Sequence, residues 1–168
     1  QDTGQQADFE INSGFTTHLR PYQKAGVLWM AELFRNNWGG CLADDMGLGK
    51  TIQMLAFLRQ FAGRGEGASL IVMPASLIHN WKNEILRFAP DLRYLVHTGN
   101  QRTRDTAIFA GFDLVLTTYG ICRNDQTMLS QYSFFYIILD ESQMIRNPEA
   151  LTSQAVYSLQ SRYRLVLT

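Results

Sequence analysis

The sequence lacks a long apolar run and contains very little cysteine. None of its segments approaches the about 18 consecutive apolar residues that a membrane-spanning helix needs, so we predict no membrane span. The first residues, Gln1 to Gly14, are polar and lack the apolar core of a secretory signal peptide. The two cysteines, Cys41 and Cys122, are too few and too isolated for a disulfide framework or a zinc site, which indicates free thiols in a reducing compartment.

The chain also lacks an excess charge of either sign. Its 15 Lys and Arg residues balance 15 Asp and Glu residues. A neutral chain does not carry the basic surplus that predicts nucleic-acid binding, so any such function has to be argued from motifs. With no internal repeat and no low-complexity segment, 168 residues of ordinary globular composition are enough for one domain with a core.

The most informative feature is a glycine-rich turn at residues 44–51, which ends in Gly49, Lys50 and Thr51. A short apolar stretch, 41–43, precedes the turn, and apolar residues at helical spacing follow it. Glycines let the backbone turn its N–H groups inward, and the next helix adds its free N-terminal N–H groups. Lys50 supplies a charge for the β- and γ-phosphates, and the Thr51 hydroxyl can bind Mg²⁺. The pattern predicts a triphosphate site.

This turn departs from the strict phosphate-loop pattern, because position 44 holds Asp44 where that pattern has its first glycine. What remains is the shorter motif G-x-G-K-T. The alternative interpretation is a glycine-rich turn with a solvated lysine.

A pair of acids forms the second candidate site. The run 134–139 is continuously apolar, as expected for a strand buried on both faces, and it ends in Asp140 and Glu141. Ligands of open α/β sheets bind at the carboxyl ends of the strands. Asp140 is placed to hold Mg²⁺ through water, and Glu141 to orient or deprotonate an attacking water. Taken alone, the pair could equally be a solvated strand end.

Short apolar strands alternate with helical patterns along the chain. We expect strands at 41–43, 70–73, 93–96, 113–117, 134–139 and 164–167. We expect helices at 21–36, 50–62, 76–88, 101–110 and 148–159, with Ser76 and Asn147 as N-caps, and no clear pattern at 118–133. This alternation predicts an α/β fold, a parallel β-sheet with helices on both faces.

The domain boundaries are predicted from the same patterns. Residues 1–17 are an irregular lead-in, and 18–168 form one nucleotide-binding lobe. Because the chain has no initiator Met and ends in a strand with no following element, we expect the natural chain to continue.

Seven short segments follow one another along the chain: Leu19 to Gln23, Ala43 to Thr51, Pro74 to Trp81, His97 to Gly99 with Arg102, Leu116 to Tyr119, Asp140 to Gln143, and Leu165 to Thr168. In this order they resemble the motifs of the first RecA-like lobe of a superfamily 2 ATPase of the SWI/SNF type, over about residues 17–168. An acid at position 44 is common in that family. Gln143 stands where many members carry His, a variant associated more with bacterial members.

The resemblance implies a three-layer RecA-like P-loop NTPase lobe that binds ATP and Mg²⁺. Gln23 should read the adenine edge, because an amide offers both the donor and the acceptor that N7 and N6 require. Gln143 and Thr168 should couple the nucleotide state to movement of the lobes. By this resemblance and the motifs above, the nucleotide should be bound by Gln23, Met46, Gly47, Leu48, Gly49, Lys50 and Thr51, the metal should be held by Thr51 and Asp140, and catalysis should use Lys50, Asp140 and Glu141.

The same resemblance implies contacts with the backbone of double-stranded DNA. Hydroxyls, arginines and backbone N–H groups suit phosphates, which position a protein without reading sequence. The contacts are expected from Ser76, Arg102, Thr117 and Thr118, although Arg102 can equally be a solvated charge and the two threonines can simply end a strand.

The implied function is the ATP-binding lobe of a DNA-dependent ATPase that translocates on double-stranded DNA and remodels protein–DNA complexes. A second RecA-like lobe in cis would complete the hydrolysis site, so the isolated chain should bind Mg-nucleotide weakly and hydrolyse it negligibly. The alternatives are a strand-separating helicase of the same superfamily, a phosphate-loop kinase, and a non-catalytic module that kept the fold. The compartment would be the bacterial cytoplasm, with the nucleoid, or the eukaryotic nucleus.

Overall fold

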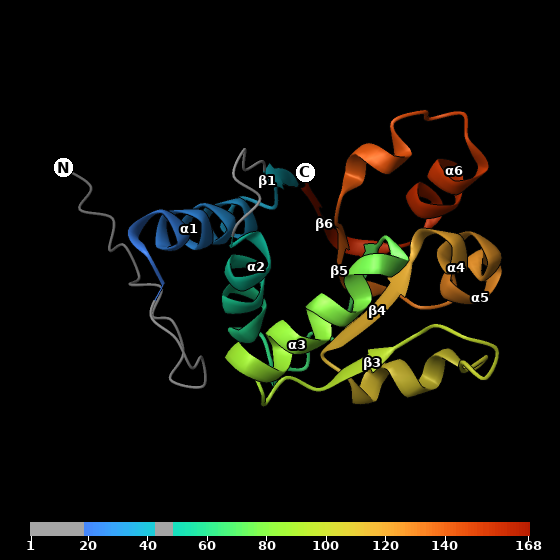
Figure 1. Cartoon of the computed structure of the whole chain (residues 1–168), viewed down its shortest axis with the longest axis horizontal. Helices are drawn as coiled ribbons and strands as arrows, with labels where there is room; N and C mark the ends of the chain where they lie inside the picture. The colour runs from blue at the N-terminus through green and yellow to red at the C-terminus, as the bar shows by residue number, and fades with distance from the viewer. Residues whose placement is uncertain (1–18, 43–48) are drawn as a thin grey trace.

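A computed structural model describes residues 19–42 and 49–168 (Figure 1). In these residues six parallel strands form one sheet in the order β1-β6-β5-β2-β4-β3. The predicted lead-in, the residue at 43 and the loop residues 44–48 lie outside the described part. The strands are β1 (Gly40–Leu42), β2 (Ser69–Met73), β3 (Tyr94–Val96), β4 (Leu114–Thr118), β5 (Phe134–Leu139) and β6 (Ser161–Leu167).

The continuous apolar runs form the centre of the sheet. Every residue of β2 and of β5 is buried, as expected for parallel strands covered on both faces. β6 lies between β5 and β1, and its burial alternates with the two-residue period of a strand. The six predicted strands are therefore confirmed, with β6 beginning three residues earlier than the apolar pattern indicates.

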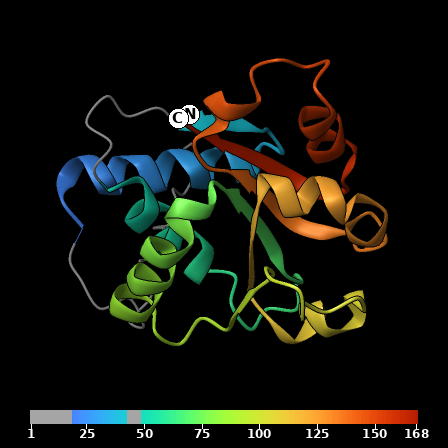
Figure 2. The ribbon, with the colours of Figure 1, turned by 45° about the vertical axis from the view of Figure 1, so that its right-hand side comes forward.

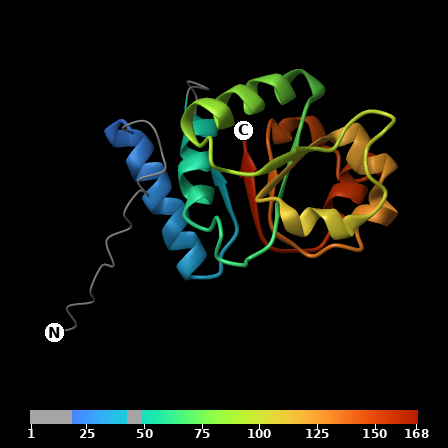
Figure 3. The ribbon, with the colours of Figure 1, turned by 90° about the horizontal axis from the view of Figure 1, so that it is seen from below.

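Helices cover both faces of this sheet. Residues of α1, α2 and α3 share one apolar core with one face of the strands, and residues of the remaining helices share a second core with the other. Figures 2 and 3 show the sheet between these two groups. The predicted three-layer RecA-like α/β/α fold is confirmed. The helices are α1 (Pro21–Arg35), α2 (Lys50–Arg59), α3 (Ile78–Phe88), α4 (Tyr119–Asn124), α5 (Gln126–Leu129) and α6 (Leu151–Ser158), with 3₁₀ turns η1 (Ala75–Leu77), η2 (Thr106–Gly111) and η3 (Ser142–Ile145).

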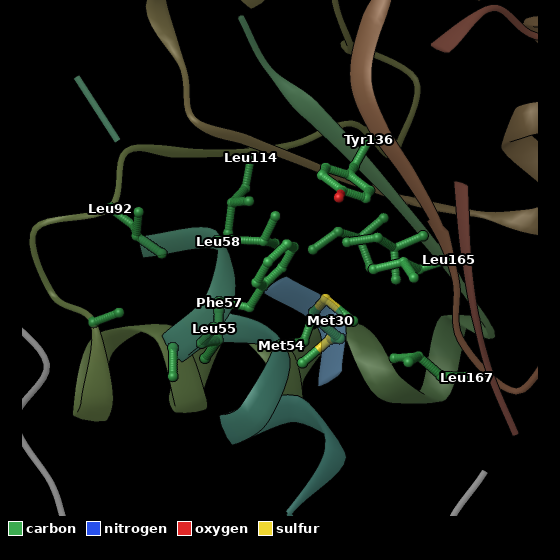
Figure 4. Packing of buried hydrophobic residues seen from close by; sticks show 14 of the residues in the cluster. Met30, Met54, Leu55, Phe57, Leu58, Leu92, Leu114, Tyr136, Leu165 and Leu167 are labelled. Carbon is green, nitrogen blue, oxygen red and sulfur yellow. The ribbon is translucent and has the colours of Figure 1, made fainter. Parts of the chain in front are cut away.

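Helix α2 is anchored most deeply in the first core (Figure 4). Met54, Leu55 and Phe57 are fully buried there. The ring of Phe57 meets that of Tyr136 in β5 edge-on, with centroids 5.6 Å apart. Burial of three such side chains contributes roughly 1.5–3 kcal/mol each to stability. This anchoring fixes the position of the helix start at Lys50.

Two predicted helix starts are wrong. Ser76 does not cap α3: the chain after β2 first makes the 3₁₀ turn η1, in which the N–H of Leu77 donates to the carbonyl of Pro74 at 3.0 Å, and α3 begins at Ile78. Asn147 does not cap α6 either. Its side chain accepts from the N–H of Glu149 at 3.0 Å and closes a local turn, so the helix begins only at Leu151.

The segments between β3 and β5 also differ from the prediction. The helix expected at 101–110 is the 3₁₀ turn η2, which starts after the side chain of Asp105 accepts from the N–H of Ala107 at 2.9 Å. The patternless stretch 118–133 contains α4 and α5. Six and four residues are too few to show an amphipathic period in the sequence, which is why these helices were not predicted.

Because all strands of the described sheet are parallel, their carboxyl ends meet at one edge. Thr168 follows β6, Asp140 follows β5, Ser76 lies just beyond β2 and Thr118 ends β4. Leu42 ends β1 at the same edge. In the part of the chain that the structure describes, no helix combines the length and the apolarity needed to cross a membrane.

Candidate functional site

The described site begins where the glycine-rich loop enters α2. Gly49 has φ +95°, a left-handed conformation that favours glycine, and its carbonyl accepts the N–H of Gln53 at 3.0 Å. The first N–H groups of a helix have no partner within the helix, and the positive end of the helix dipole lies with them. Such a start suits an anion. Met46, Gly47 and Leu48 lie outside the described residues.

Lys50 is the first residue of α2, and it is buried. Its ammonium donates to the main-chain oxygen of Thr168, the residue after β6. The N–H of Thr168 in turn donates to the carbonyl of Leu42 in β1 at 3.2 Å. Pairing of β1 with β6 thus brings the end of the chain to the start of the predicted cradle. Thr51, the next helix residue, is half-buried.

Gln23 joins this cluster from α1. It is buried, and its Oε1 accepts the N–H of Arg20 at 2.9 Å, which caps the helix. Its Nε2 lies beside Gly49, only 2.5 Å from where a Cβ at that position would stand. The structure therefore brings Gln23, Gly49 and Lys50 together, with the amide oxygen of Gln23 bonded to Arg20 and its amide nitrogen beside Gly49.

Asp140 is placed by β5 and is nearly buried. Its Oδ2 accepts the indole N–H of Trp81 at 2.8 Å, and its Oδ1 accepts the N–H of Glu141 at 2.9 Å. Burial raises the pKa of Asp140 above its ordinary value, while these two hydrogen bonds and, more weakly, the charge of Lys50 act to lower it. β5 and β6 are neighbours in the sheet, so Asp140, which follows β5, lies at the strand end next to that of Thr168, which accepts the hydrogen bond of Lys50.

Glu141 follows in a strained backbone conformation. Its φ of 51° and ψ of 49° lie in the left-handed region, which is uncommon for residues other than glycine or asparagine. Strain of this kind is often found at functional positions. The amide of Gln143 donates to a carboxylate oxygen of Glu141, so the predicted water-orienting and coupling residues are in contact.

Two open cavities lie beside these acids. One of about 540 Å³ is lined by Ser142, Gln143, Arg146 and Thr168, so the two predicted coupling residues share it. The second, of about 450 Å³, is lined by Pro74, Ser76, Leu77, Glu141, Gln143 and Met144. Gln143 lines both cavities. It therefore lies between Thr168, at the end of β6, and the segment that follows β2.

Within residues 19–42 and 49–168, no cluster of three or more His, Cys, Asp or Glu side chains could hold a metal by itself. Mg²⁺ is usually bound through one or two protein oxygens, waters and phosphates of a substrate. Thr51 and Asp140 are the protein oxygens that the sequence predicts for it.

The four predicted DNA-contacting residues lie where β2, β4 and β3 end, which we call the outer half of the same edge. Ser76 is exposed. Thr118 caps α4, because its side chain accepts the N–H of Ile121 at 3.2 Å. Thr117 is fully buried, and its hydroxyl donates to the carbonyl of His97 at 2.8 Å. The structure therefore does not present the Thr117 hydroxyl at the surface.

Arg102 is engaged by an acid that sequence reasoning missed. Its guanidinium binds Asp125 with two hydrogen bonds, Nε to Oδ2 at 2.6 Å and Nη2 to Oδ1 at 2.9 Å. The buried His97 contacts Asp125 Oδ2 through Nε2 at 2.7 Å. The hydrogen bond from Arg102 holds the pKa of Asp125 below its ordinary value. Asp125 lies more than 20 positions from both partners, and no local pattern marks it.

Comparisons with known proteins agree with this geometry. The family model described as SNF2-related domain matches residues 22–168. The Bacillus subtilis protein YwqA, which bears the provisional name ATP-dependent helicase/translocase, is 39% identical over 166 residues, 96% of this chain and 18% of its own length. The ISWI chromatin-remodeling complex ATPase CHR17 of Arabidopsis thaliana is 39% identical over 158 residues, 89% of this chain and 15% of its own.

A solved structure agrees as well. The Sulfolobus solfataricus SWI2/SNF2 ATPase core, determined in complex with dsDNA, superposes with a TM-score of 0.84 at 38% identity. That match covers 95% of this chain and 34% of the solved chain. The chain thus spans less than a fifth of these curated relatives and about a third of the solved core.

Proposed function

We propose that this chain is the ATP-binding lobe of a motor that couples ATP hydrolysis to movement on double-stranded DNA. The chain belongs to the family of SNF2-related domains. The observation that carries this proposal is the convergence of Gln23, Gly49, Lys50 and Asp140 at the carboxyl ends of neighbouring strands. The whole protein would use this movement to remodel protein–DNA complexes.

Each residue of the cluster has a defined task in this proposal. Gln23 binds the adenine edge, and the backbone of Met46, Gly47, Leu48 and Gly49 donates N–H groups to the phosphates. Lys50 exchanges its hydrogen bond to Thr168 for the β- and γ-phosphates. Thr51 and Asp140 hold Mg²⁺, which neutralises charge on the phosphates when it is bound. Glu141 orients the attacking water.

The coupling role of Gln143 and Thr168 is supported by the cavity that they share and by the contact between Gln143 and Glu141. A change at the γ-phosphate would reach Glu141 first and Gln143 next. Because a glutamine amide does not take up a proton as histidine does, Gln143 would transmit position through hydrogen bonds alone.

DNA contact would come from the outer half of the edge, at Ser76, Arg102, Thr117 and Thr118. The hydroxyl of the exposed Ser76 suits phosphate oxygens. Thr117 would act through its backbone, since its hydroxyl is bonded inside. A protein of this kind works where DNA is, in the cytoplasm of a bacterium or the nucleus of a eukaryotic cell.

The test is turnover with and without duplex DNA, measured on this chain and on a protein that joins it to its second lobe. We expect negligible hydrolysis by the chain alone, because an arginine of the second lobe completes the site. The joined protein should hydrolyse ATP in response to DNA, and Glu141→Gln should abolish turnover while preserving nucleotide binding. DNA-stimulated turnover by the isolated lobe, or full activity of Glu141→Gln, would contradict the proposal. Strand separation in an unwinding assay would favour the helicase alternative.

A further inference from the structure

Two aromatic side chains from different segments hold Asp140. Trp81 in α3 donates its indole N–H to Asp140 Oδ2 at 2.8 Å, and Tyr119, the first residue of α4, donates its hydroxyl to the main-chain carbonyl of Asp140 at 2.7 Å. The N–H of Asp140 donates to the carbonyl of Val72 at 2.8 Å. The carboxylate, the carbonyl and the N–H of Asp140 are therefore each fixed by a separate element.

The bond from Trp81 is more than packing. Trp81 is fully buried, so its single polar atom cannot reach water, and a buried donor is costly unless it is bonded. An apolar side chain of similar size could fill the same space. The indole N–H adds a direction: it occupies one oxygen of Asp140 while the N–H of Glu141 occupies the other, and the carboxylate cannot rotate without breaking one of the two bonds.

The two aromatic residues also have informative neighbours in sequence. Trp81 lies in the first turn of α3, just after the 3₁₀ turn that carries Ser76, and Tyr119 directly follows Thr118. Ser76 and Thr118 are predicted to meet the DNA backbone. These two segments, which follow β2 and β4, thus meet at one residue that follows β5: Trp81 bonds to the carboxylate of Asp140 and Tyr119 to its main-chain carbonyl.

We propose that Trp81 and Tyr119 are positioning residues of the metal site, which hold the Asp140 carboxylate in the orientation that binds Mg²⁺ and tie it to the segments that carry Ser76 and Thr118. This inference rests on the proposed function. Outer partners of metal ligands orient those ligands, and their loss typically costs about 10- to 100-fold in metal affinity. Trp81 acts on the carboxylate itself, whereas Tyr119 acts on the main chain, so the larger effect belongs to Trp81.

The test is a Mg²⁺ titration of the chain in the presence of a fluorescent ATP analogue. We expect Trp81→Phe to raise the Mg²⁺ concentration at half-saturation about tenfold or more, with the affinity for metal-free nucleotide unchanged. Trp29→Phe is the matched control, because it makes the same change at a half-buried core position in α1. A half-saturation point of Trp81→Phe within twofold of that of Trp29→Phe would overturn the proposal.

A second pair of variants tests Tyr119. Tyr119→Phe removes only the hydroxyl that bonds to Asp140, and we expect a few-fold weaker response to Mg²⁺. Tyr163→Phe is its control, since it removes a hydroxyl that donates to Asn37 Oδ1 at 2.9 Å, away from Asp140. Equal responses from these two variants would exclude a role for Tyr119.

The indole resonances of the wild type supply a further measurement, in which the response to Mg²⁺ is read from the unmodified protein rather than from a variant. The chain has three tryptophans, whose ¹⁵N–¹H indole resonances are assigned by replacing each in turn. Adding Mg²⁺ to the nucleotide-bound chain should move the Trp81 resonance more than those of Trp29 and Trp38. If the wild type binds Mg-nucleotide but the Trp81 signal stays in place, the positioning role alone is wrong. If the wild type binds no Mg-nucleotide, the proposed function of the chain fails and this inference fails with it.

Discussion

Gln23 in α1 packs directly against Gly49 at the start of α2, so closely that a Cβ at position 49 would stand 2.5 Å from Gln23 Nε2. The other amide atom of Gln23, Oε1, is held by the N–H of Arg20. The residue predicted to read the base and the loop predicted to bind the phosphates are thus fitted to one another. Any side chain at position 49 disturbs both.

The first prediction concerns Gly49→Ala. It forces a Cβ into a left-handed position, at a cost of roughly 1–2 kcal/mol in the free energy of unfolding, and it also displaces Gln23. Gly63→Ala is the matched control, because Gly63 has φ +74° and open space around it. Urea unfolding should show a loss in both variants, whereas Mg-ATPγS binding should weaken only in Gly49→Ala. Normal Mg-ATPγS binding by Gly49→Ala would show that Gln23 and Gly49 are not part of the nucleotide site.

The second prediction concerns the base specificity that Gln23 confers. Gln23→Glu keeps the oxygen that accepts from Arg20, and so it preserves the helix cap, but it replaces the Nε2 donor. The contact that is lost is the one to adenine N7, and one hydrogen bond is worth about 1 kcal/mol, so we expect the affinity for ATP to fall about five- to tenfold. Competition binding with ATP and 7-deaza-ATP, which lacks N7, measures this contact: the wild type should prefer ATP by this factor, and Gln23→Glu should not distinguish the two. An equal preference for ATP in both proteins would show that Gln23 does not read N7.

The third prediction concerns pH. Asp125 has its pKa lowered, mainly by the hydrogen bond from Arg102, so its ionised form stabilises the fold. This stabilisation is complete above the ordinary aspartate value near 3.8 and is lost as the pH falls through the lower value of the folded chain. Below about pH 4 the free energy of unfolding should therefore fall more steeply in the wild type than in Asp125→Asn.

The same variant has an expected effect at neutral pH. Asp125→Asn should cost about 1.5–3 kcal/mol, because it weakens hydrogen bonds to a charged partner in a largely buried network. Asp91→Asn is the control: Asp91 also pairs with an arginine, Arg59, but is 45% exposed, so we expect a loss of at most about 1 kcal/mol. Equal losses in the two variants would show that the Asp125 network is not a special source of stability.

The fourth prediction concerns the strain at Glu141. Glu141→Gly should raise the free energy of unfolding by about 0.5–1 kcal/mol, because glycine adopts the left-handed conformation without the cost of a Cβ. Turnover of the joined two-lobe protein should be lost, since the carboxylate is gone. Chemical denaturation of the chain measures the first effect. A lower stability of Glu141→Gly would mean that the side chain contributes more to the fold than its strained backbone costs.

Much of the fold could be predicted because its centre is uniformly apolar. The run 134–139 becomes β5 with the predicted bounds, since a strand buried on both faces needs no alternation. The starts of α3 and α6 could not be predicted correctly, because local turns at Pro74 and Asn147 satisfy the backbone before the helices begin. Capping residues and turn residues are the same residue types, and the sequence does not distinguish them.

The candidate site likewise contains residues that local sequence patterns indicate and residues that they do not. Lys50 and Asp140 follow strands and could be located from local pattern. For Trp81, by contrast, no local pattern indicates its bond to Asp140. Its partner Asp140 is 59 positions away, and the direction of its indole N–H depends on how α3 packs on the sheet. Contacts of this range follow from packing rather than from any periodicity of the sequence.

The most direct test of the account is calorimetric titration of Mg-ATPγS into the chain and into Lys50→Ala. Lys82→Ala is the control, because it makes the same change at a half-buried position in α3. The account predicts weak binding by the wild type and by Lys82→Ala, and its loss in Lys50→Ala. Equal binding by the wild type and Lys50→Ala, or no binding by any of the three, would contradict the claim that this lobe carries a working phosphate site.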